Sequence, residues 1–161
     1  MRIGVVSDTH NHLRNVEQIV TLFNNAGVER VVHTGDITQP KTLVALGKLE
    51  MPLVGVYGNN DLEREALETA IADQAFGIID PPLRLEWAGR VLSVVHDPLD
   101  INASMLSECD YVLHGHNHLH VHEQRDDCWV FNPGECAGMM SGLNAIGIVD
   151  LETAATELVR F

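Results

Sequence analysis

The chain of 161 residues is predicted to be an α/β protein, and three observations support this fold class. Its first half alternates short apolar, β-branched runs with segments of helical periodicity, a pattern typical of parallel strands connected by helices. Its second half contains strand-like runs joined by short turns. The length and the 45% hydrophobic content are ordinary for one globular domain, so residues 1–161 are expected to form a single domain.

The first half is expected to contain three strands, each followed by a helix. The strands are assigned to the apolar runs at 2–7, 30–34 and 53–57. The first helix spans 13–26, and Gly27 is placed to end it. The second helix begins at Pro40 and ends before Pro52. A third helix runs to about residue 72, with Asp61 as either its N-cap or a residue of the functional site.

The second half is expected to consist mostly of strands. Strand-like runs occur at 83–87, 91–96, 110–114, 119–124, 128–131, 145–151 and 155–160. Only 102–108 has a helical pattern. These strands either extend the first sheet or form a second sheet packed on it, and the pattern leaves both arrangements open.

The charge of the chain argues against several classes of partner. Ten Lys and Arg against 23 Asp and Glu give a net charge of −13. Sequence-independent nucleic-acid binding needs Lys and Arg to neutralise phosphates, so neither stable nucleic-acid binding nor an anionic membrane surface is expected. No apolar run approaches the roughly 18 residues of a membrane span. Asp8 interrupts the apolar start of the chain before the core of a signal peptide could form. Three cysteines are a sparse, odd set that suits a reduced protein better than a disulfide framework, so a cytoplasmic protein is expected.

Side chains that can bind metals follow five of the predicted strands. In open α/β sheets, ligands bind at the carboxyl ends of strands, so these groups are expected to meet in one place. Two pairs of candidates, Asp8 with His10 and His116 with His118, are each two residues apart. In extended backbone this spacing would point both side chains of a pair to the same side. The seven candidates are Asp8, His10, Asp36, Asn59, His96, His116 and His118.

Seven groups of this kind exceed the needs of one ion. A single site usually takes three or four protein ligands, whereas seven ligands with one shared carboxylate complete two sets of four. Two divalent ions held about 3.5–4 Å apart clamp the attacking and leaving oxygens in a phosphoryl displacement. We therefore expect two divalent metal ions, manganese first, with nickel, iron, zinc or cobalt as alternatives.

The remaining histidines are assigned to structure. His12 is placed at the start of the first helix, and His33 within a strand. His114 is expected to be packed or hydrogen-bonded in its strand, while His120 and His122 begin the next one.

The order and spacing of the motifs resemble those of the calcineurin-like metallophosphoesterases. The motifs are D-x-H at 8–10, G-D at 35–36, G-N-x-D at 58–61, a lone His at 96 and G-H-x-H at 115–118. The length and the N-P-G at 132–134 are similar to those of the small bacterial and archaeal phosphodiesterase branch. The resemblance covers nearly the whole chain, and it implies a four-layer αββα sandwich with the site at the strand ends.

The resemblance also implies a role for each candidate. One metal would be held by Asp8, His10 and His118, the other by Asn59, His96 and His116, and Asp36 would bridge them. A hydroxide bridging the metals would attack phosphorus directly, without a covalent enzyme intermediate. The implied protein is a metal-dependent phosphoric ester hydrolase acting on a small phosphodiester or nucleotide-like substrate.

The G-N-x-D motif departs from the pattern of many relatives. They have G-N-H-D, in which the His helps the leaving group and the Asp orients it. This chain has Asn60 in place of that His, followed by Asp61. The Asn60 amide can hydrogen-bond a phosphate oxygen but cannot transfer a proton. Asn60 and Asp61 are the candidate catalytic residues, and unactivated monoesters are expected to be poor substrates.

Two other functions compete with this interpretation. A eukaryotic membrane-trafficking subunit shares the fold and binds partner proteins with a degraded metal site, whereas all seven ligand types are intact here. A nuclease would share the metal chemistry, but a chain of net charge −13 lacks its electrostatic footprint. The sequence leaves open the physiological substrate, the native metal and the oligomeric state, a homodimer included.

Overall fold

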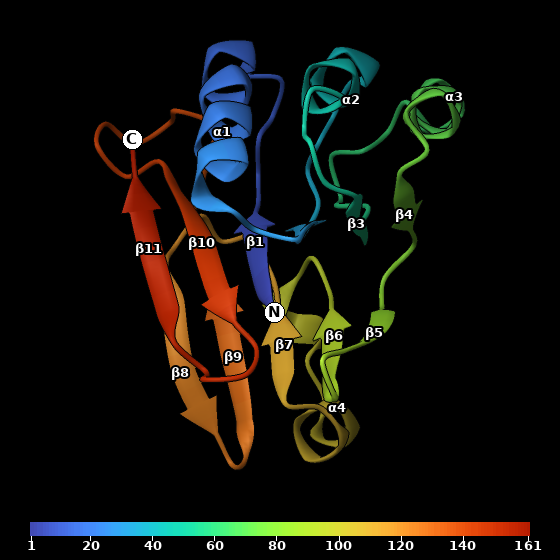
Figure 1. Cartoon of the computed structure of the whole chain (residues 1–161). Helices are drawn as coiled ribbons and strands as arrows, with labels where there is room; N and C mark the ends of the chain where they lie inside the picture. The colour runs from blue at the N-terminus through green and yellow to red at the C-terminus, as the bar shows by residue number, and fades with distance from the viewer.

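The computed structural model describes residues 1–161 and has four layers (Figure 1). Three helices cover the outer face of a six-stranded sheet, and a five-stranded sheet lies on its inner face. The short helix α4 (Ala103–Glu108) lies on the far side of the second sheet. The expected αββα arrangement is therefore confirmed.

The six-stranded sheet has the order β11-β10-β1-β2-β3-β4. Four strands are parallel, namely β1 (Arg2–Val6), β2 (Arg30–His33), β3 (Leu53–Val56) and β4 (Gly77–Ile79). They are connected by the helices α1 (Leu13–Ala26), α2 (Pro40–Leu46) and α3 (Arg64–Gln74). The antiparallel strands β10 (Ala145–Asp150) and β11 (Thr156–Arg160) extend the sheet beside β1.

The five-stranded sheet has the order β5-β6-β7-β9-β8. Its strands are β5 (Leu83–Trp87), β6 (Arg90–Val94), β7 (Tyr111–Leu113), β8 (Val121–Arg125) and β9 (Cys128–Asn132). A 3₁₀ turn, η1 (Pro98–Asp100), precedes α4. The two arrangements that the sequence left open both occur, because β10 and β11 extend the first sheet while β5 to β9 form the second.

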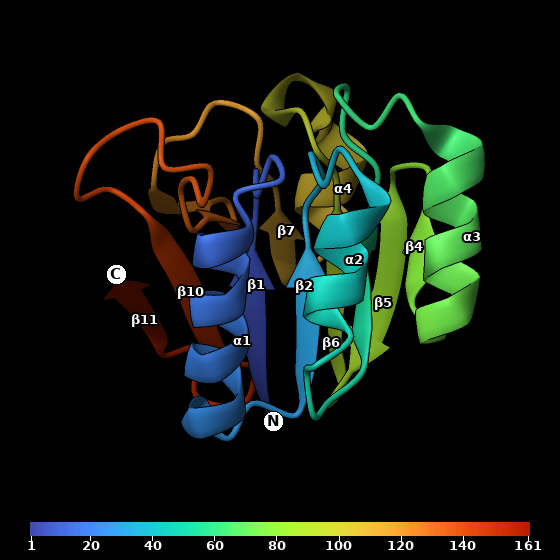
Figure 2. The same cartoon turned by 90° about the horizontal axis from the view of Figure 1, so that it is seen from above.

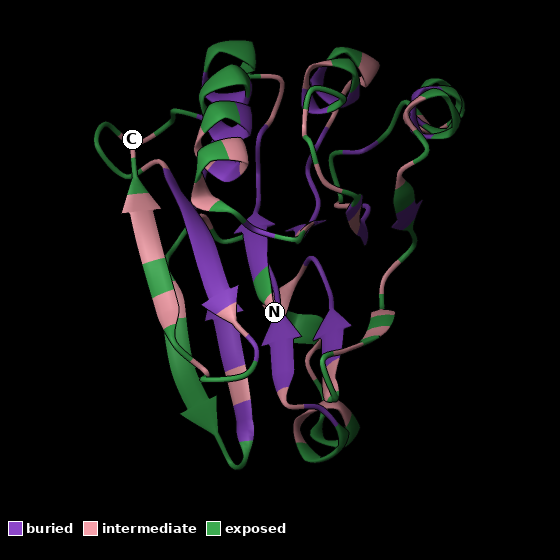
Figure 3. Cartoon of the chain, viewed as in Figure 1, coloured by how far each residue is buried: buried purple, intermediate pink, exposed green.

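The alternation of side chains along β1 builds two cores. Ile3 and Val5 face the second sheet and belong to the same buried cluster as Phe131. Gly4, between them, faces the helices and lies against the Phe23 ring of α1. A Cβ on Gly4 would collide with that ring. Figure 3 shows the result, with buried central strands and more exposed outer strands such as β8 and β11.

Two details differ from expectation, and a third decides between alternatives that the sequence left open. The strand β4 was not anticipated, because Gly77–Ile79 is too short for a period to show. Helix α2 ends at Leu46 with Gly47 as its C-cap, although Leu49 still packs on the core. Helix α3 begins at Arg64 with Glu63 at the N-cap position, so Asp61 is not its N-cap.

None of the helices is long and apolar enough to cross a membrane. Strands from both sheets end along one edge of the molecule. The loops that follow β1 and β2 lie together along the upper edge of the view in Figure 2, where strands of both sheets end.

Candidate metal centre

The loops after β1, β2, β3, β6 and β7 bring all seven candidate ligands into one cluster at this edge. Its floor is buried, with Asp8, Asp36 and His96 exposed by 0%, 1% and 3%. Its rim is open to solvent, since Asn59 and His116 are exposed. The arrangement is a shallow site with a charged, desolvated base.

Asp8 carries a buried oxygen without a protein partner. Its Oδ2 accepts hydrogen bonds from the Ser7 hydroxyl and from the His116 backbone N–H, the latter at 3.1 Å. Its Oδ1 has no hydrogen-bond partner, and neither has Nε2 of His10 nearby. Burial raises the pKa of Asp8. A buried carboxylate oxygen left this way is costly unless a cation compensates it.

Two imidazole rings lie near that oxygen. Nε2 of His118 lies 3.5 Å from Asp8 Oδ1, and Nε2 of His10 lies 3.9 Å from the same atom. One potential ligand atom from each of these residues lies within 4.8 Å of the others. This spacing could hold a metal ion, and the three residues are the ones that the family resemblance assigns to one metal.

A second group forms around His96. Its Nδ1–H donates to the Thr34 carbonyl at 2.9 Å, which leaves the lone pair of Nε2 facing the centre. Oδ1 of Asn59 lies 2.9 Å from this Nε2 and 2.9 Å from Nδ1 of His116. The two imidazole nitrogens are 3.3 Å apart. Convergence of acceptor atoms on one point is the chemistry of a cation site.

Asp36 lies between the two groups. Its Oδ2 is 3.2 Å from Nε2 of His10, and its Oδ1 is 3.4 Å from Nε2 of His96. Burial disfavours its ionised form, but the adjacent His10 imidazole and the hydrogen bonds from Asn60 outweigh burial and lower the pKa of Asp36. The neighbouring carboxylate in turn raises the pKa of His10. One oxygen of Asp36 thus faces each group.

The two candidate catalytic residues are turned toward the protein. Asn60 donates its backbone N–H to Asp36 Oδ1 at 2.9 Å and its side-chain amide to Oδ2 at 2.7 Å. The Asp61 carboxylate accepts from the backbone N–H groups of Gly58, Thr38 and Asp36 at 2.6, 2.6 and 3.1 Å. Burial raises the pKa of Asp61. Asp61 therefore joins the loops that follow β2 and β3.

The backbone of the cluster is not extended, so the expected geometry of the two-residue pairs is wrong. Five of the seven candidates have positive φ: Asp8, 52°; His10, 39°; Asp36, 59°; His116, 70°; and His118, 59°. The members of the second pair separate, because His116 joins Asn59 while His118 joins Asp8. Each left-handed residue costs on the order of 1–3 kcal/mol, and such strain concentrates at functional sites.

Two glycines permit the close approach of these loops. A Cβ on Gly35 would lie 2.6 Å from Nδ1 of His96, and one on Gly115 would lie 2.8 Å from Oδ2 of Asp8. Both separations are too short for real atoms, so any larger residue would displace a candidate ligand. The glycines that begin the G-D and G-H-x-H motifs are therefore required for steric reasons.

Sequence reasoning missed Glu135, which follows the N-P-G motif. Its side chain is fully buried. One carboxylate oxygen lies 3.1 Å from Nδ1 of His118, and the other accepts the Met140 backbone N–H at 2.6 Å. A carboxylate in a loop next to N-P-G was the available signal, but loop acids are usually exposed, and only the structure shows this one buried.

Four of the other five histidines have the structural positions expected of them, whereas His120 was expected to begin a strand that starts only at Val121. His12 is the N-cap of α1, where its Nδ1 accepts the Asn15 backbone N–H at 3.3 Å. His33 ends β2, where complete burial lowers its pKa to about 3. His114 is buried beside β7 and hydrogen-bonds the Gly115 carbonyl at 3.1 Å. His122 lies in β8, with His120 just before it.

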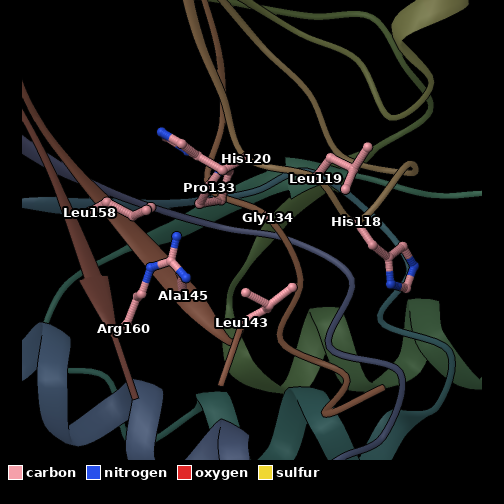
Figure 4. Close-up of a pocket in the computed structure, with 9 residues that line it drawn as sticks. All are labelled: His118, Leu119, His120, Pro133, Gly134, Leu143, Ala145, Leu158 and Arg160. Atoms are coloured by element: carbon pink, nitrogen blue, oxygen red, sulfur yellow. The ribbon is translucent and has the colours of Figure 1, made fainter. Parts of the chain in front are cut away.

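Two cavities flank the cluster. One, of about 310 Å³, is lined by Asn59 and His96 themselves and by Tyr57 and Arg64. The Arg64 guanidinium lies 3.4 Å from the Tyr57 ring centroid. The other, of about 200 Å³, lies between β11 and the 118–120 segment. Figure 4 shows the His118 ring pointing away from Arg160 across this cavity. His118 is the one candidate ligand in the lining of the second cavity, whereas Asn59 and His96 both line the first.

The fold and the cluster together define a metallophosphoesterase-like protein, and comparison with known proteins agrees. Residues 1–154 match the calcineurin-like phosphoesterase superfamily domain, so the chain belongs to that superfamily. It is 36% identical over 156 residues to a phosphodiesterase of Methanocaldococcus jannaschii, covering 94% of each chain. It is 25% identical over 154 residues to phosphodiesterase YfcE of Escherichia coli, covering 83% and 78%.

A solved structure of an archaeal phosphodiesterase superposes with a TM-score of 0.88 at 34% identity, covering 100% of both chains. The family resemblance, the fold and the enzyme class expected from the sequence, a phosphoesterase, are thereby confirmed. The family implies divalent metal ions. The unpartnered Asp8 oxygen and the converging imidazole nitrogens suit such ions in their chemistry.

Proposed function

We propose that this protein is a binuclear metal-dependent phosphodiesterase that hydrolyses a small phosphodiester. The observation that carries the proposal is the placement of Asp36 between two groups of ligand atoms, with one oxygen 3.2 Å from His10 and the other 3.4 Å from His96. A carboxylate shared in this way suits two ions held about 3.5–4 Å apart.

The ligand sets follow from the two groups. Asp8, His10 and His118 would hold one ion, Asn59, His96 and His116 would hold the other, and Asp36 would be shared between them. Mixed carboxylate, amide and imidazole ligands make manganese the first candidate, with nickel, iron, zinc and cobalt as alternatives. When bound, the two ions supply an acidified water as nucleophile and neutralise the phosphate.

The chain's own residues hold this arrangement in place. The Thr34 carbonyl fixes the tautomer of His96, so that Nε2 faces the centre. The two hydrogen bonds from Asn60 fix the orientation of the Asp36 carboxylate. Asp61 binds three backbone N–H groups in two loops and so fixes the positions of Asp36 and Asn59 relative to each other. Asp61 is a positioning residue in this account.

The substrate approaches from the exposed side of Asn59 and His116. The cavity of about 310 Å³ beside Asn59 and His96 is the place for an ester arm of the diester. Arg64, stacked on Tyr57 and paired with Asp80 at 2.7 Å, is the cationic side chain of that cavity. A small arm suits its size, which favours a small phosphodiester or nucleotide-like substrate over a polymer.

The alternatives make different demands. A non-catalytic scaffold has no need of seven converging ligand groups, and a nuclease has to attract a polyanion to a chain of net charge −13. We further propose that the chain acts as one domain in the cytoplasm, because strands of both sheets share one core and all three cysteines are buried and free.

The test compares two chromogenic substrates across metals. Protein stripped with a chelator and reloaded with manganese should hydrolyse bis-p-nitrophenyl phosphate faster than p-nitrophenyl phosphate. The stripped protein should be inactive until a divalent ion is added, and nickel, iron, zinc and cobalt are tried in parallel. Hydrolysis at the same rate with and without metal would refute the proposal.

A further inference from the structure

Glu135 is a fully buried carboxylate without a Lys or Arg partner. It lies in the loop after β9, and its side chain is 0% exposed. An ionised carboxylate removed from water is costly unless hydrogen bonds and an opposite charge compensate it. Its only ionic contact is with His118, whose Nδ1 lies 3.1 Å from Oε2. The position therefore needs an explanation that involves His118.

The His118 ring links Glu135 to the metal cluster. Its Nδ1 faces Glu135, while its Nε2 faces Asp8 Oδ1 at 3.5 Å. A carboxylate can only accept hydrogen bonds, so Nδ1 of His118 carries the proton and its N–H donates a hydrogen bond to Oε2 of Glu135. In the neutral imidazole this leaves the lone pair on Nε2, directed into the cluster.

We propose that Glu135 is a positioning residue that fixes the tautomer and the ring orientation of His118 for metal binding. The inference rests on the proposed function, because it assigns to His118 the role of a metal ligand. When a carboxylate accepts the second N–H of a metal-binding histidine, replacing that carboxylate typically weakens metal affinity by 10–100-fold. The other oxygen of Glu135 accepts the Met140 N–H, so the same carboxylate also anchors the 136–144 loop beside the cluster.

The substitution Glu135→Gln separates positioning from packing. It keeps the shape of the side chain but leaves one oxygen where the native residue has two acceptors. The native acceptors receive the N–H of Met140 and the Nδ1–H of His118. In either orientation of the glutamine amide, one of these donors faces an NH₂ group. If the amide oxygen stays on Met140, His118 has to move its proton to Nε2 or rotate.

The first measurement is made on metal-free protein. Nitrogen NMR of ¹⁵N-histidine-labelled wild type should show the His118 proton on Nδ1. In Glu135→Gln the signal should shift toward the Nε2-protonated form. The wild-type spectrum alone is decisive if the variant fails to fold, because a proton on Nε2 of His118 in the wild type would overturn the proposal.

The second measurement is metal affinity, by competition with a chelator. Glu135→Gln should bind one ion roughly 10–100-fold more weakly and the other with nearly wild-type affinity. The matched control is Glu123→Gln, which removes the same charge from an exposed position in β8 and should leave both affinities unchanged.

The outcomes distinguish the two levels of the account. If wild type binds two ions and Glu135→Gln binds both with unchanged affinity and an unchanged His118 tautomer, Glu135 is only structural and the proposed function stands. If wild type binds no divalent ion, the proposed function fails and the positioning role fails with it.

Discussion

Asp36 is the residue on which both groups of the candidate centre depend. Each of its oxygens faces a different histidine, so Asp36→Asn removes a negative charge from both groups at once. We expect kcat/KM for a phosphodiester to fall by roughly 10²–10³-fold, the size of effect seen when a preorganised electrostatic group is removed. Steady-state kinetics at saturating manganese measure it.

The control for this substitution is His12→Ala. His12 caps α1 through the Asn15 N–H, so its loss should lower stability by up to about 1 kcal/mol while kcat/KM stays near wild type. Similar, small losses of activity in both variants would contradict the central role given to Asp36.

Asn60 determines how the enzyme depends on its leaving group. An amide cannot transfer a proton, and a positioned acid is typically worth 10²–10⁴-fold. We therefore expect kcat/KM to fall steeply as the pKa of the leaving phenol rises across a series of phenyl phosphodiesters. Asn60→His should not flatten that slope, because the carboxylate of Asp61 is already taken by three backbone N–H groups and is not free to orient an imidazole.

The comparison needs the same series for both proteins. A flat slope in the parent would show that another acid already protonates the leaving group. A much flatter slope in Asn60→His would show that Asp61 can turn away from its backbone partners.

His33, at the end of β2, makes the stability of the folded protein depend on pH. Burial lowers its pKa from 6.5 to about 3, so the unfolded chain takes up a proton at a higher pH than the native protein does. The stability this residue contributes is present above pH 6.5 and is lost as the pH falls toward 3. One proton corresponds to about 1.4 kcal/mol per pH unit.

His33→Gln should reduce that slope. Glutamine can still accept the Gly35 N–H and donate to the Thr9 hydroxyl, the two bonds that His33 makes. Denaturant unfolding of metal-free protein between pH 6 and pH 4 should therefore show a shallower decline in the variant. Equal slopes would mean that His33 is not the group responsible.

The elements show what sequence can and cannot provide. Helix α1 could be predicted with both ends, because its apolar period is long and Gly27 takes the left-handed C-cap. The strand β4 could not, because it consists of Gly77–Ile79 and exists only through pairing with β3. Asp61 precedes α3 as an N-cap would, but the backbone N–H groups of Asp36 and Thr38, in the loop after β2, compete for its carboxylate.

The candidate site shows the same division. Its seven residues could be grouped from sequence because parallel strands end at one edge of a sheet. Their approach through left-handed turns could not, since no residue pattern signals positive φ at Asp8 or His118. Glu135 was missed because its role depends on a contact with His118, which is 17 residues away in sequence.

Metal should also stabilise the protein as a whole. The buried Asp8 and Asp36 are close together, and burial raises the pKa of Asp8, so the metal-free centre holds costly charge. Ions that bind only the native state raise its apparent stability by about 2.7 kcal/mol at 100 times their dissociation constant. Thermal unfolding with manganese should show a higher Tm than unfolding with a chelator, and identical curves would contradict this.

A centre of two ions per chain is tested most directly by the metal content of the reconstituted protein. Protein stripped with a chelator, reloaded with manganese and freed of excess ion should contain two manganese ions per chain by elemental analysis. Asp36→Asn, treated in the same way, should contain fewer. One ion per chain in the wild type, or none, would contradict a centre built from two ligand sets around Asp36.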